Sequence, residues 1–373
     1  MADHGGFLSA DRTFLALLGG VLLLGFVLLA SASGPTGFVR FHDTYYFLKH
    51  QIIFGLVPGI IGFIIASKIP YSHYRRYAGL MLVLSLVLLL SVFIPGLGTD
   101  LGTFAKQWIV LGPLTLQPSE LVKLTFLIYV AAWMEKRTQT ELRDLHSGLI
   151  PFAIVLSAVM GLLLLEHDTG TLAVIVIMAL GVYLVAGAPW KYFGLFGGAG
   201  IAGFALLLKL SPYRAARVMT FLHPELDPKG VGYHMNQALL AVGSGGFLGR
   251  GYGHSLQKFQ YLPEVSGDSI FAVIAEELGF VLTTAFLALY VTFLCRGIRI
   301  AMNAQDAFGK YLAAGVMCWI AAQAFFNIAA MVGVAPITGV PLPLVSYGGT
   351  ALAVTLTALG IVVNVSKYQK KNL

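Results

Sequence analysis

Residues 77–95 read YAGLMLVLSLVLLLSVFIP, an apolar run without a charged side chain. A helix of roughly 20 such residues is long enough to cross the hydrocarbon core of a bilayer. The whole chain has this character, because 57% of its 373 residues are hydrophobic and 11% are charged, whereas a soluble domain carries about 25% charged residues. We therefore expect an integral membrane protein. The alternating polarity of outer-membrane barrel strands is absent from the sequence.

Segments of similar character predict about ten transmembrane helices in an all-α membrane protein. We expect a single membrane domain over residues 1–373, with one large extracytoplasmic loop, about residues 211–267, between the seventh and eighth helices. The first segment is long enough to remain as a helix, so no cleaved signal peptide is expected. The expected helices are 12–32, 48–66, 77–95, 118–134, 148–165, 169–187, 191–210, 268–295, 308–333 and 346–366.

The formal net charge is +7, and the distribution of the basic residues is more informative than their number. If the ten helices are correct, most Lys and Arg fall in loops on one side, and the short loops on the other side hold only Arg40, Lys49 and Lys106. The positive-inside rule then predicts that both termini are cytoplasmic. The charge therefore describes membrane topology and does not indicate nucleic-acid binding.

Asp268 is the most unusual polar residue, because it stands where the longest loop re-enters an apolar segment. Carboxylates near bilayer depth are costly and are candidates for function. Two interpretations stay open: a helix cap that accepts backbone N–H bonds, and a general base at the outer membrane surface. Glu276 lies about two turns further along the expected helix and could line a cavity beneath Asp268. Alternatively, Glu276 and Glu277 are buried structural hydrogen-bonding groups.

Further polar residues gather in the expected loops on the outer side. Glu120 and Lys123 stand three residues apart at the start of a helix, on one face. They are either a structural salt bridge or a charged wall of the site. Asp168 precedes Thr169 and Gly170 and is interpreted either as a helix cap or as a site acid. Because these residues converge on one face, we predict a site at the external membrane surface.

Basic residues in the outer loops suggest an anionic ligand, since such loops usually lack Lys and Arg. A phosphate group held by Arg or Lys gains charge-assisted hydrogen bonds. Acids and bases together fit a lipid-linked diphosphate, although a solvated basic face stays open as the alternative. The candidate phosphate ligands are Lys106, Arg214, Arg217, Arg250 and Lys258.

Cofactor motifs are absent from the sequence. The glycine-rich run 243–253, GSGGFLGRGYG, matches neither the dinucleotide fingerprint in register nor the phosphate loop of nucleotide hydrolases. The run before it, residues 232–242, could form a short interfacial helix. No His and Cys cluster has zinc spacing. We therefore expect no dedicated metal site, and no cofactor is firmly implied.

Several motifs give the chain a resemblance to a known family. They are QPSE at 117–120, GSGG at 243–246, LPE at 262–264 with Asp268 and EELG at 276–279, and PLP at 341–343 with SYGG at 346–349. In this order and spacing, the chain resembles the shape, elongation, division and sporulation (SEDS) proteins, the FtsW/RodA/SpoVE family, over nearly its whole length. The residues Ser255, Gln257 and Lys258 look more like the division and sporulation branch.

The resemblance implies a peptidoglycan glycosyltransferase that polymerises lipid II during septal wall synthesis. It implies that Asp268 deprotonates the acceptor sugar's 4-hydroxyl, and that undecaprenyl diphosphate leaves with inversion. We assign supporting roles to Glu120 and Lys123 as a coupled pair, and to Asp168 and Glu276 as cavity acids. The implied partners are a class B penicillin-binding protein, which supplies the transpeptidase, and other divisome membrane proteins. A divalent cation, Mg²⁺ or Mn²⁺, at the diphosphate is compatible with this chemistry.

Three departures from the family pattern stand out. The sequence has GDS at 267–269 where the family usually has TDF, QWI at 107–109 where it usually has RWI, and EHDTG at 166–170 where it usually has EPDLG. Asp268 and Glu120 are retained. A lipid II flippase and a non-catalytic division scaffold stay open as alternatives. A flippase needs a polar path to the cytoplasmic face, whereas the intramembrane acids cluster towards the outer half.

Overall fold

All ten predicted segments are helical in the computed structural model, which describes residues 10–99, 107–112, 114–210, 212–223 and 232–369. Among the described residues, six helices are long and apolar enough to cross a membrane by length and composition. The helices of the ten segments are α1 (Arg12–Phe41), α2 (Tyr46–Gln51) continued by η2 (Ile52–Leu56) and α3 (Val57–Lys68), α5 (Ala78–Ser91), α6 (Pro118–Glu135), η3 (Leu145–Leu149) continued by α8 (Ile150–Leu165), α9 (Thr169–Val185), α10 (Trp190–Leu210), α13 (Ile270–Met302), α14 (Ala307–Met331) and α15 (Gly349–Ser366).

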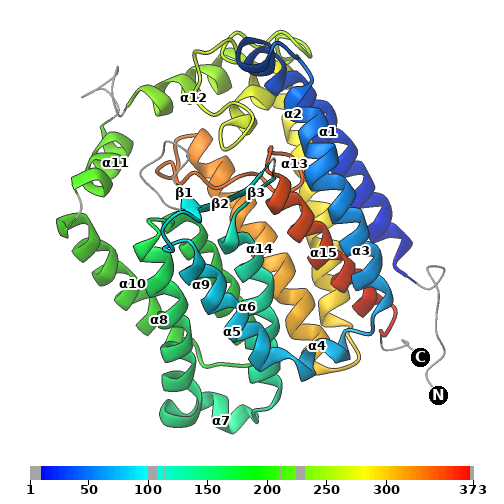
Figure 1. Cartoon of the computed structure of the whole chain (residues 1–373), viewed down its shortest axis with the longest axis vertical. Coiled ribbons are helices and arrows are strands. Elements are labelled where there is room, and N and C mark those ends of the chain that lie inside the picture. The colour runs from blue at the N-terminus through cyan, green and yellow to red at the C-terminus, as the bar shows by residue number, and fades with distance from the viewer. Residues whose placement is uncertain (1–9, 100–106, 113, 211, 224–231, 370–373) are drawn as a thin grey trace.

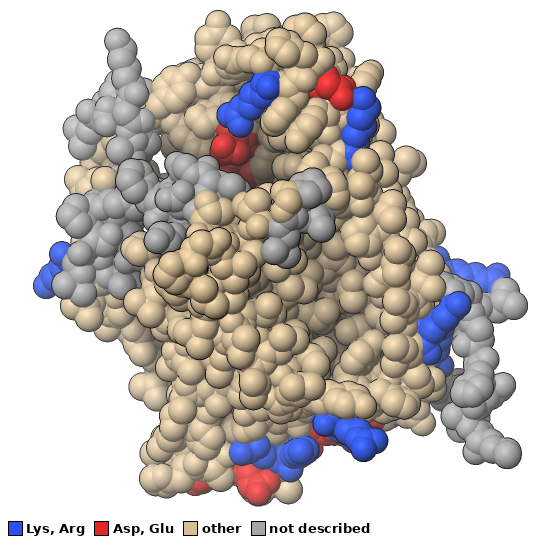
Figure 2. All heavy atoms as spheres, in the orientation of Figure 1, with Lys and Arg blue, Asp and Glu red and all other residues tan. Residues whose placement is uncertain are grey.

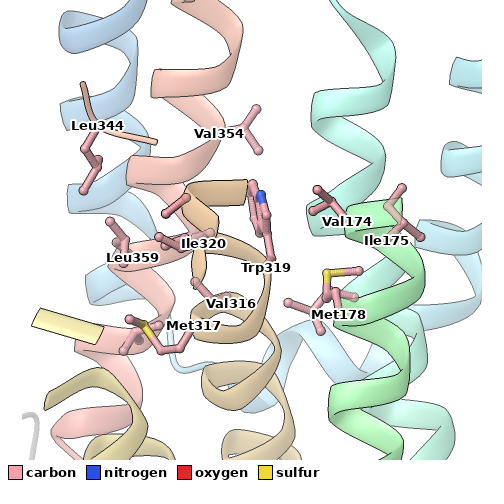
Figure 3. Close-up of a cluster of buried hydrophobic side chains, with 14 of the residues drawn as sticks. Val174, Ile175, Met178, Val316, Met317, Trp319, Ile320, Leu344, Val354 and Leu359 are labelled. Atoms are coloured by element: carbon pink, nitrogen blue, oxygen red, sulfur yellow. The ribbon is translucent and has the colours of Figure 1, made fainter. Parts of the chain in front are cut away.

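α14 and α15 lie in the middle of this bundle (Figure 1). In their most apolar stretches 67% and 72% of the residues are buried, against 33% in α1 and 28% in α13. Fully buried Trp319 of α14 lies between Val174 of α9 and Val354 of α15 (Figure 3). α1 and α13 instead expose large apolar side chains such as Leu23 and Val281. Helices that are apolar on all sides are either buried or in contact with lipid. α14 and α15 are of the first kind, and α1 and α13 are of the second.

Basic side chains gather at the end of the molecule that carries α4 (Ser72–Arg76) and α7 (Gln139–Arg143), which we call the α7 end. Lys and Arg side chains line this lower edge in Figure 2. Arg75 pairs there with Glu135 at 2.7 Å. The start of α1 and the end of α15 also meet, because the backbone N–H of Asp11 donates to Ser366 Oγ (3.2 Å). The sequence prediction that basic residues share one side agrees with this arrangement.

The opposite end, which we call the α12 end, holds secondary structure where the sequence predicts loops. Residues 98–116 contain three short antiparallel strands, β1 (Gly98–Thr99), β2 (Trp108–Leu111) and β3 (Leu114–Leu116). The segment 211–267 contains α11 (Pro212–Leu222) and α12 (Tyr233–Ser244). The large loop between the seventh and eighth helices is therefore partly helical, and α12 confirms that residues 232–242 can form a short helix.

α13 is interrupted at Gly279, whose φ of 69° and ψ of −176° are not helical. The backbone N–H groups of Phe280 and Val281 donate instead to the carbonyls of Gly246 (2.8 Å) and Phe247 (3.2 Å). A spanning helix needs roughly 20 residues, and the part of α13 after Gly279 is long enough to supply them. The expected eighth helix, 268–295, is thus corrected to two helical parts joined at a break.

Candidate active site

Asp268 lies in a turn that immediately precedes α13. The helix begins at Ile270, its N-cap residue is Ser269 rather than Asp268, and the Ser269 side chain makes no capping hydrogen bond. The cap interpretation of Asp268 is therefore wrong. Because Asp268 is outside the helix, the predicted placement of Glu276 two turns further along the same helix is also corrected.

α14 and the loop that precedes α15 hold the backbone of this turn through hydrogen bonds. Asn327 Nδ2 of α14 donates both to the carbonyl of Asp268 (2.7 Å) and to that of Val340 (2.9 Å). Ser346 Oγ donates to the carbonyl of Gly267 (2.6 Å). Asn327 and Ser346 are themselves buried, at 2% and 6% exposure. The position of Asp268 is therefore fixed by groups that are far away in the sequence.

The SYGG motif, residues 346–349, connects this turn to the second helical segment. The backbone N–H of Tyr347 donates to the carbonyl of Ser266 (2.8 Å). Gln51 of α2 donates through Nε2 to the Ser346 carbonyl (3.2 Å) and accepts from the Gly348 N–H (2.9 Å). The motif thus anchors the Asp268 turn to α2.

The Asp268 side chain has polar neighbours on α12 and at the start of α13. Ser269 Oγ donates to Asp268 Oδ1 at 3.4 Å, and His234 Nε2 lies 2.6 Å from Ser269 Oγ. A Cβ atom added to Gly339 would lie 3.9 Å from Asp268 Oδ2. The loop before α15 therefore passes close to the carboxylate. The sequence analysis did not single out His234, because an isolated His has no spacing pattern to mark it.

A second polar cluster lies at the starts of α6 and α9. Lys123 Nζ and Glu120 Oε1 are 2.7 Å apart in an ion pair whose side chains are 0% and 2% exposed. The Lys123 ammonium also lies 4.8 Å from the ring centre of Trp319. Asp168 accepts from Ser119 Oγ (3.1 Å) and, as the N-cap of α9, from the N–H of Thr171 (2.9 Å). Asp168 therefore caps α9, which is one of its two sequence interpretations, and its partner Ser119 adjoins the Glu120–Lys123 pair.

The loop residues Thr338–Val340 lie between the two clusters. A Cβ atom on Gly170, near the start of α9, would approach Val340 Cγ2 to 2.6 Å and the Thr338 carbonyl to 2.8 Å. The Val340 carbonyl shares the Asn327 amide with Asp268. The start of α9 and the Asp268 turn are therefore both linked to the same loop. Figure 2 shows a hollow at the α12 end, with acidic atoms inside it and a basic side chain at its rim.

Glu166, at the end of α8, is a further acid that the sequence analysis did not assign to the site. Its side chain is fully buried, and neither carboxyl oxygen has a hydrogen-bond partner within the described part of the chain. Burial, with a smaller contribution from the charge of Asp168, raises the pKa of Glu166 to about 9. Glu166 is therefore a neutral carboxylic acid at neutral pH.

Glu276 and Glu277 hold the loop that follows α12 and do not face Asp268. Glu276 accepts from Ser255 Oγ (2.5 Å) and from Arg250 Nε (3.2 Å). Glu277 pairs with Lys258 Nζ at 2.7 Å, and both side chains are buried. Both acids are therefore buried structural hydrogen-bonding groups, which is the second interpretation that the sequence left open. It corrects the assignment of Glu276 as a cavity acid.

Of the basic residues predicted to bind a diphosphate, Arg250 and Lys258 have described side chains, and both are in ion pairs with acids of α13. Lys258 is only 3% exposed and is occupied by its ion pair, so its predicted role is corrected. The Arg250 side chain is 39% exposed and pairs with Glu276 through Nε. α11 carries Arg214 and Arg217, but their side chains lie outside the described residues, as does all of Lys106.

The described residues do not fit a protein-built metal centre. They contain no group of three or more His, Cys, Asp or Glu side chains placed to hold a metal ion.

A known protein family is similar to this chain over nearly its whole length. Over residues 11–371 the chain matches the model of the cell cycle protein family FtsW/RodA/SpoVE. The chain belongs to this family. Its membership confirms the resemblance inferred from the QPSE, LPE and SYGG motifs.

Two relatives show how completely the family likeness covers the chain. Stage V sporulation protein E of Bacillus subtilis (strain 168) is 37% identical over 351 residues, which are 94% of this chain and 95% of that protein. The probable peptidoglycan glycosyltransferase FtsW of Trichlorobacter lovleyi is 38% identical over 358 residues, which are 95% of this chain and 93% of that protein. The likeness therefore extends over full-length members of the FtsW/RodA/SpoVE family.

Solved structures show the same fold. A chain from a peptidoglycan synthase complex, described as coordinating polymerization and crosslinking, has a TM-score of 0.81 at 30% identity and covers 98% of this chain and 100% of that one. The rod shape determining protein RodA of Thermus thermophilus has a TM-score of 0.71 at 28% identity and covers 98% and 99%. This FtsW/RodA/SpoVE protein is thus a multi-pass membrane protein with the RodA fold.

Proposed function

We propose that this protein is a peptidoglycan glycosyltransferase that polymerises lipid II. Relatives of similar length are named probable peptidoglycan glycosyltransferases, which supports the reaction class. The observation that carries the proposal is the fixed turn of Asp268, whose backbone carbonyl accepts from Asn327 and whose neighbour Gly267 accepts from Ser346. A general base needs such a fixed position relative to the hydroxyl group that it deprotonates.

In the proposed reaction, the Asp268 carboxylate accepts the proton of the acceptor sugar's 4-hydroxyl as that oxygen attacks the anomeric carbon of the donor glycan. The new carbon–oxygen bond forms on one face of the carbon, and the bond to the diphosphate breaks on the other, so the configuration inverts. Undecaprenyl diphosphate leaves with the bonding electrons, and the proton stays on Asp268. Asp268 can act again only after this proton has left.

The diphosphate needs cationic groups on the side opposite the base, because negative charge develops there as the bond breaks. We propose Arg214 and Arg217 of α11 for this role, together with Lys106 and the exposed part of the Arg250 guanidinium. Mg²⁺ or Mn²⁺, if used, would be held by diphosphate oxygens. The buried Glu120–Lys123 pair and Asp168 would fix the shape of the wall formed by α6 and α9.

We also propose that the protein works in the bacterial cytoplasmic membrane with its α7 end and both termini inside. The basic residues at the α7 end support this orientation through the positive-inside rule. The α12 end, with Asp268, would then face outwards and meet lipid II at the outer membrane surface. We place it at the division septum, alongside other divisome membrane proteins, and the description of its family as cell cycle proteins supports this role.

The proposed partner is a cognate class B penicillin-binding protein, which would crosslink the glycan strands. A similar chain has been solved within a peptidoglycan synthase complex, which supports this kind of partner. The crosslinking step therefore belongs to the partner in this proposal.

The test uses the purified full-length protein with labelled lipid II in detergent and Mg²⁺, with and without the cognate penicillin-binding protein. Polymer resolved on a gel is the expected result. If neither sample yields polymer, the glycosyltransferase is contradicted, and transport of labelled lipid II in vesicles then separates a flippase from a division scaffold. A flippase moves the lipid across the bilayer, and a scaffold does not.

A further inference from the structure

The proposed mechanism leaves a proton on Asp268, and two neighbouring side chains are placed to remove it. Ser269 Oγ lies 3.4 Å from Asp268 Oδ1 and 2.6 Å from His234 Nε2. We propose that Ser269 and His234 form a hydrogen-bonded path that carries the proton from Asp268 to the imidazole after each sugar transfer. This inference rests on the proposed function and adds two residues to it.

The placement of Ser269 favours this role over a structural one. Ser269 occupies the N-cap position of α13, where a Ser hydroxyl usually accepts a backbone N–H of the first turn. Here its side chain makes no such bond. The side chain is fully buried, so water does not compete for the hydroxyl. The hydroxyl instead bridges a carboxylate and an imidazole.

His234 is placed to pass the proton on. It lies near the start of α12, at the end of the molecule that carries Asp268, and it is only half-buried. An imidazole accepts and releases protons near neutral pH, which a Ser hydroxyl or an amide does not do. The path therefore leads from the buried Ser269 to a group that reaches the solvent.

The proton transfer is balanced at every atom. The Asp268 carboxyl gives its proton to Ser269 Oγ while the Ser269 hydroxyl proton moves to His234 Nε2, because a hydroxyl can donate and accept at once. The products are a carboxylate, an intact hydroxyl and an imidazolium. The imidazolium releases one proton to water, and exchange of the remaining ring proton through water returns Nε2 to its unprotonated, accepting form before the next turnover. No bond to the sugar is involved, so Ser269 and His234 are positioning residues that act through Asp268.

The proposed path predicts how variants of Ser269 and His234 should change the kinetics of polymerisation. His234→Ala should lower kcat by about 100-fold, a typical lower limit for lost acid–base assistance, with little change in KM. His234→Gln keeps a hydrogen-bonding side chain but cannot carry a proton, so it should be equally slow. Ser269→Ala should also be slow, and the double variant Ser269→Ala/His234→Ala should be no slower than either single variant. These effects should not add, because both residues belong to one path.

The experiment measures lipid II polymerisation by each full-length variant and adds free imidazole to the assay. Imidazole should restore much of the rate of His234→Ala, because it can occupy the vacated space and accept the proton. It should not help Ser269→Ala, which retains His234. The matched control is His254→Ala, which removes an exposed His from the loop after α12. This control should match the wild type with and without imidazole.

Three results would overturn the path. These are a wild-type kcat for His234→Gln, a defect of His234→Ala confined to KM, or a slow His234→Ala that imidazole does not improve although its unfolding temperature is unchanged. Failure of the proposed function would look different. In that case the wild type makes no polymer, or Asp268→Asn is as active as the wild type.

Discussion

At the residue scale, the buried Glu120–Lys123 pair has the largest expected effect on stability. Its side chains are 2% and 0% exposed and 2.7 Å apart. We expect Lys123→Met alone to lower the free energy of unfolding by about 3–5 kcal/mol, because it leaves an uncompensated buried carboxylate. The double variant Glu120→Gln/Lys123→Met should recover most of this loss. Thermal unfolding in detergent of the wild type, both single variants and the double variant gives the coupling.

Polymerase activity of the double variant then separates the two readings of this pair. Activity that returns together with stability indicates a structural salt bridge. A stable but inactive double variant indicates a charged wall of the site. A double variant less stable than both single variants would contradict the account of the buried charge.

Glu166 gives a prediction about pH. Burial raises its pKa to about 9 in the folded protein, from an ordinary value of 4.5. The folded state therefore holds a proton that the unfolded chain has released, so stability should fall as the pH rises between these two values. Glu166→Gln is neutral at every pH and should remove this part of the slope. Its unfolding temperature at pH 8 should be a few degrees above that of the wild type, and equal slopes would contradict a neutral Glu166.

The chemistry of single residues was easier to predict from sequence than their partners. Asp268, Glu120 and Asp168 were identifiable because acids in an apolar chain are rare. The ion pairs of Arg250 with Glu276 and of Lys258 with Glu277 were not predictable from the sequence. These residues become neighbours because α13 breaks at Gly279. The choice of ion-pair partner depends on tertiary packing, which a linear pattern does not contain.

At the scale of secondary-structure elements, the break in α13 requires glycine. Gly279 has φ 69°, and a Cβ atom there would lie 2.1 Å from the backbone N of Gly249. We expect Gly279→Ala to destabilise the protein by more than about 1–3 kcal/mol, the usual cost of a strained backbone conformation. Proteolysis of the loop at residues 246–261 should also become faster, because this loop pairs with the break.

The matched control for this prediction is Gly161→Ala in α8. A Cβ atom at Gly161 meets nothing within 4 Å, and Ala favours a helix over Gly by roughly 1 kcal/mol. Gly161→Ala should be neutral or slightly stabilising. Equal unfolding temperatures for the two variants would show that the break does not depend on the conformation of Gly279.

The long apolar helices were predictable as elements, because hydrophobicity over 20 residues is a strong signal. The three strands at residues 98–116 were not, since each has at most four residues and too short a pattern to detect. The break at Gly279 was also hidden, because glycine is frequent in membrane helices. The break is stabilised by hydrogen bonds to the carbonyls of residues 246 and 247, which lie in the loop after α12.

At the scale of the whole molecule, the orientation in the membrane can be tested by labelling. In a background lacking Cys295 and Cys318, a new Cys is placed at exposed His254 near the α12 end or at exposed Lys136 near the α7 end. A membrane-impermeant maleimide should label His254→Cys in intact spheroplasts, and Lys136→Cys only after the membrane is opened. The reverse pattern would place Asp268 on the cytoplasmic side and exclude the proposed site of reaction.

The central claim is that Asp268 is the base of a glycosyltransferase, and the most direct test is the initial rate of lipid II polymerisation by purified Asp268→Asn. The control is Asp306→Asn, because Asp306 caps the far end of α14 and Asn is also a good cap. We predict that Asp268→Asn is slower than wild type by at least about 100-fold at an unchanged unfolding temperature, while Asp306→Asn keeps the wild-type rate. A folded Asp268→Asn protein that polymerises lipid II at the wild-type rate would contradict the account.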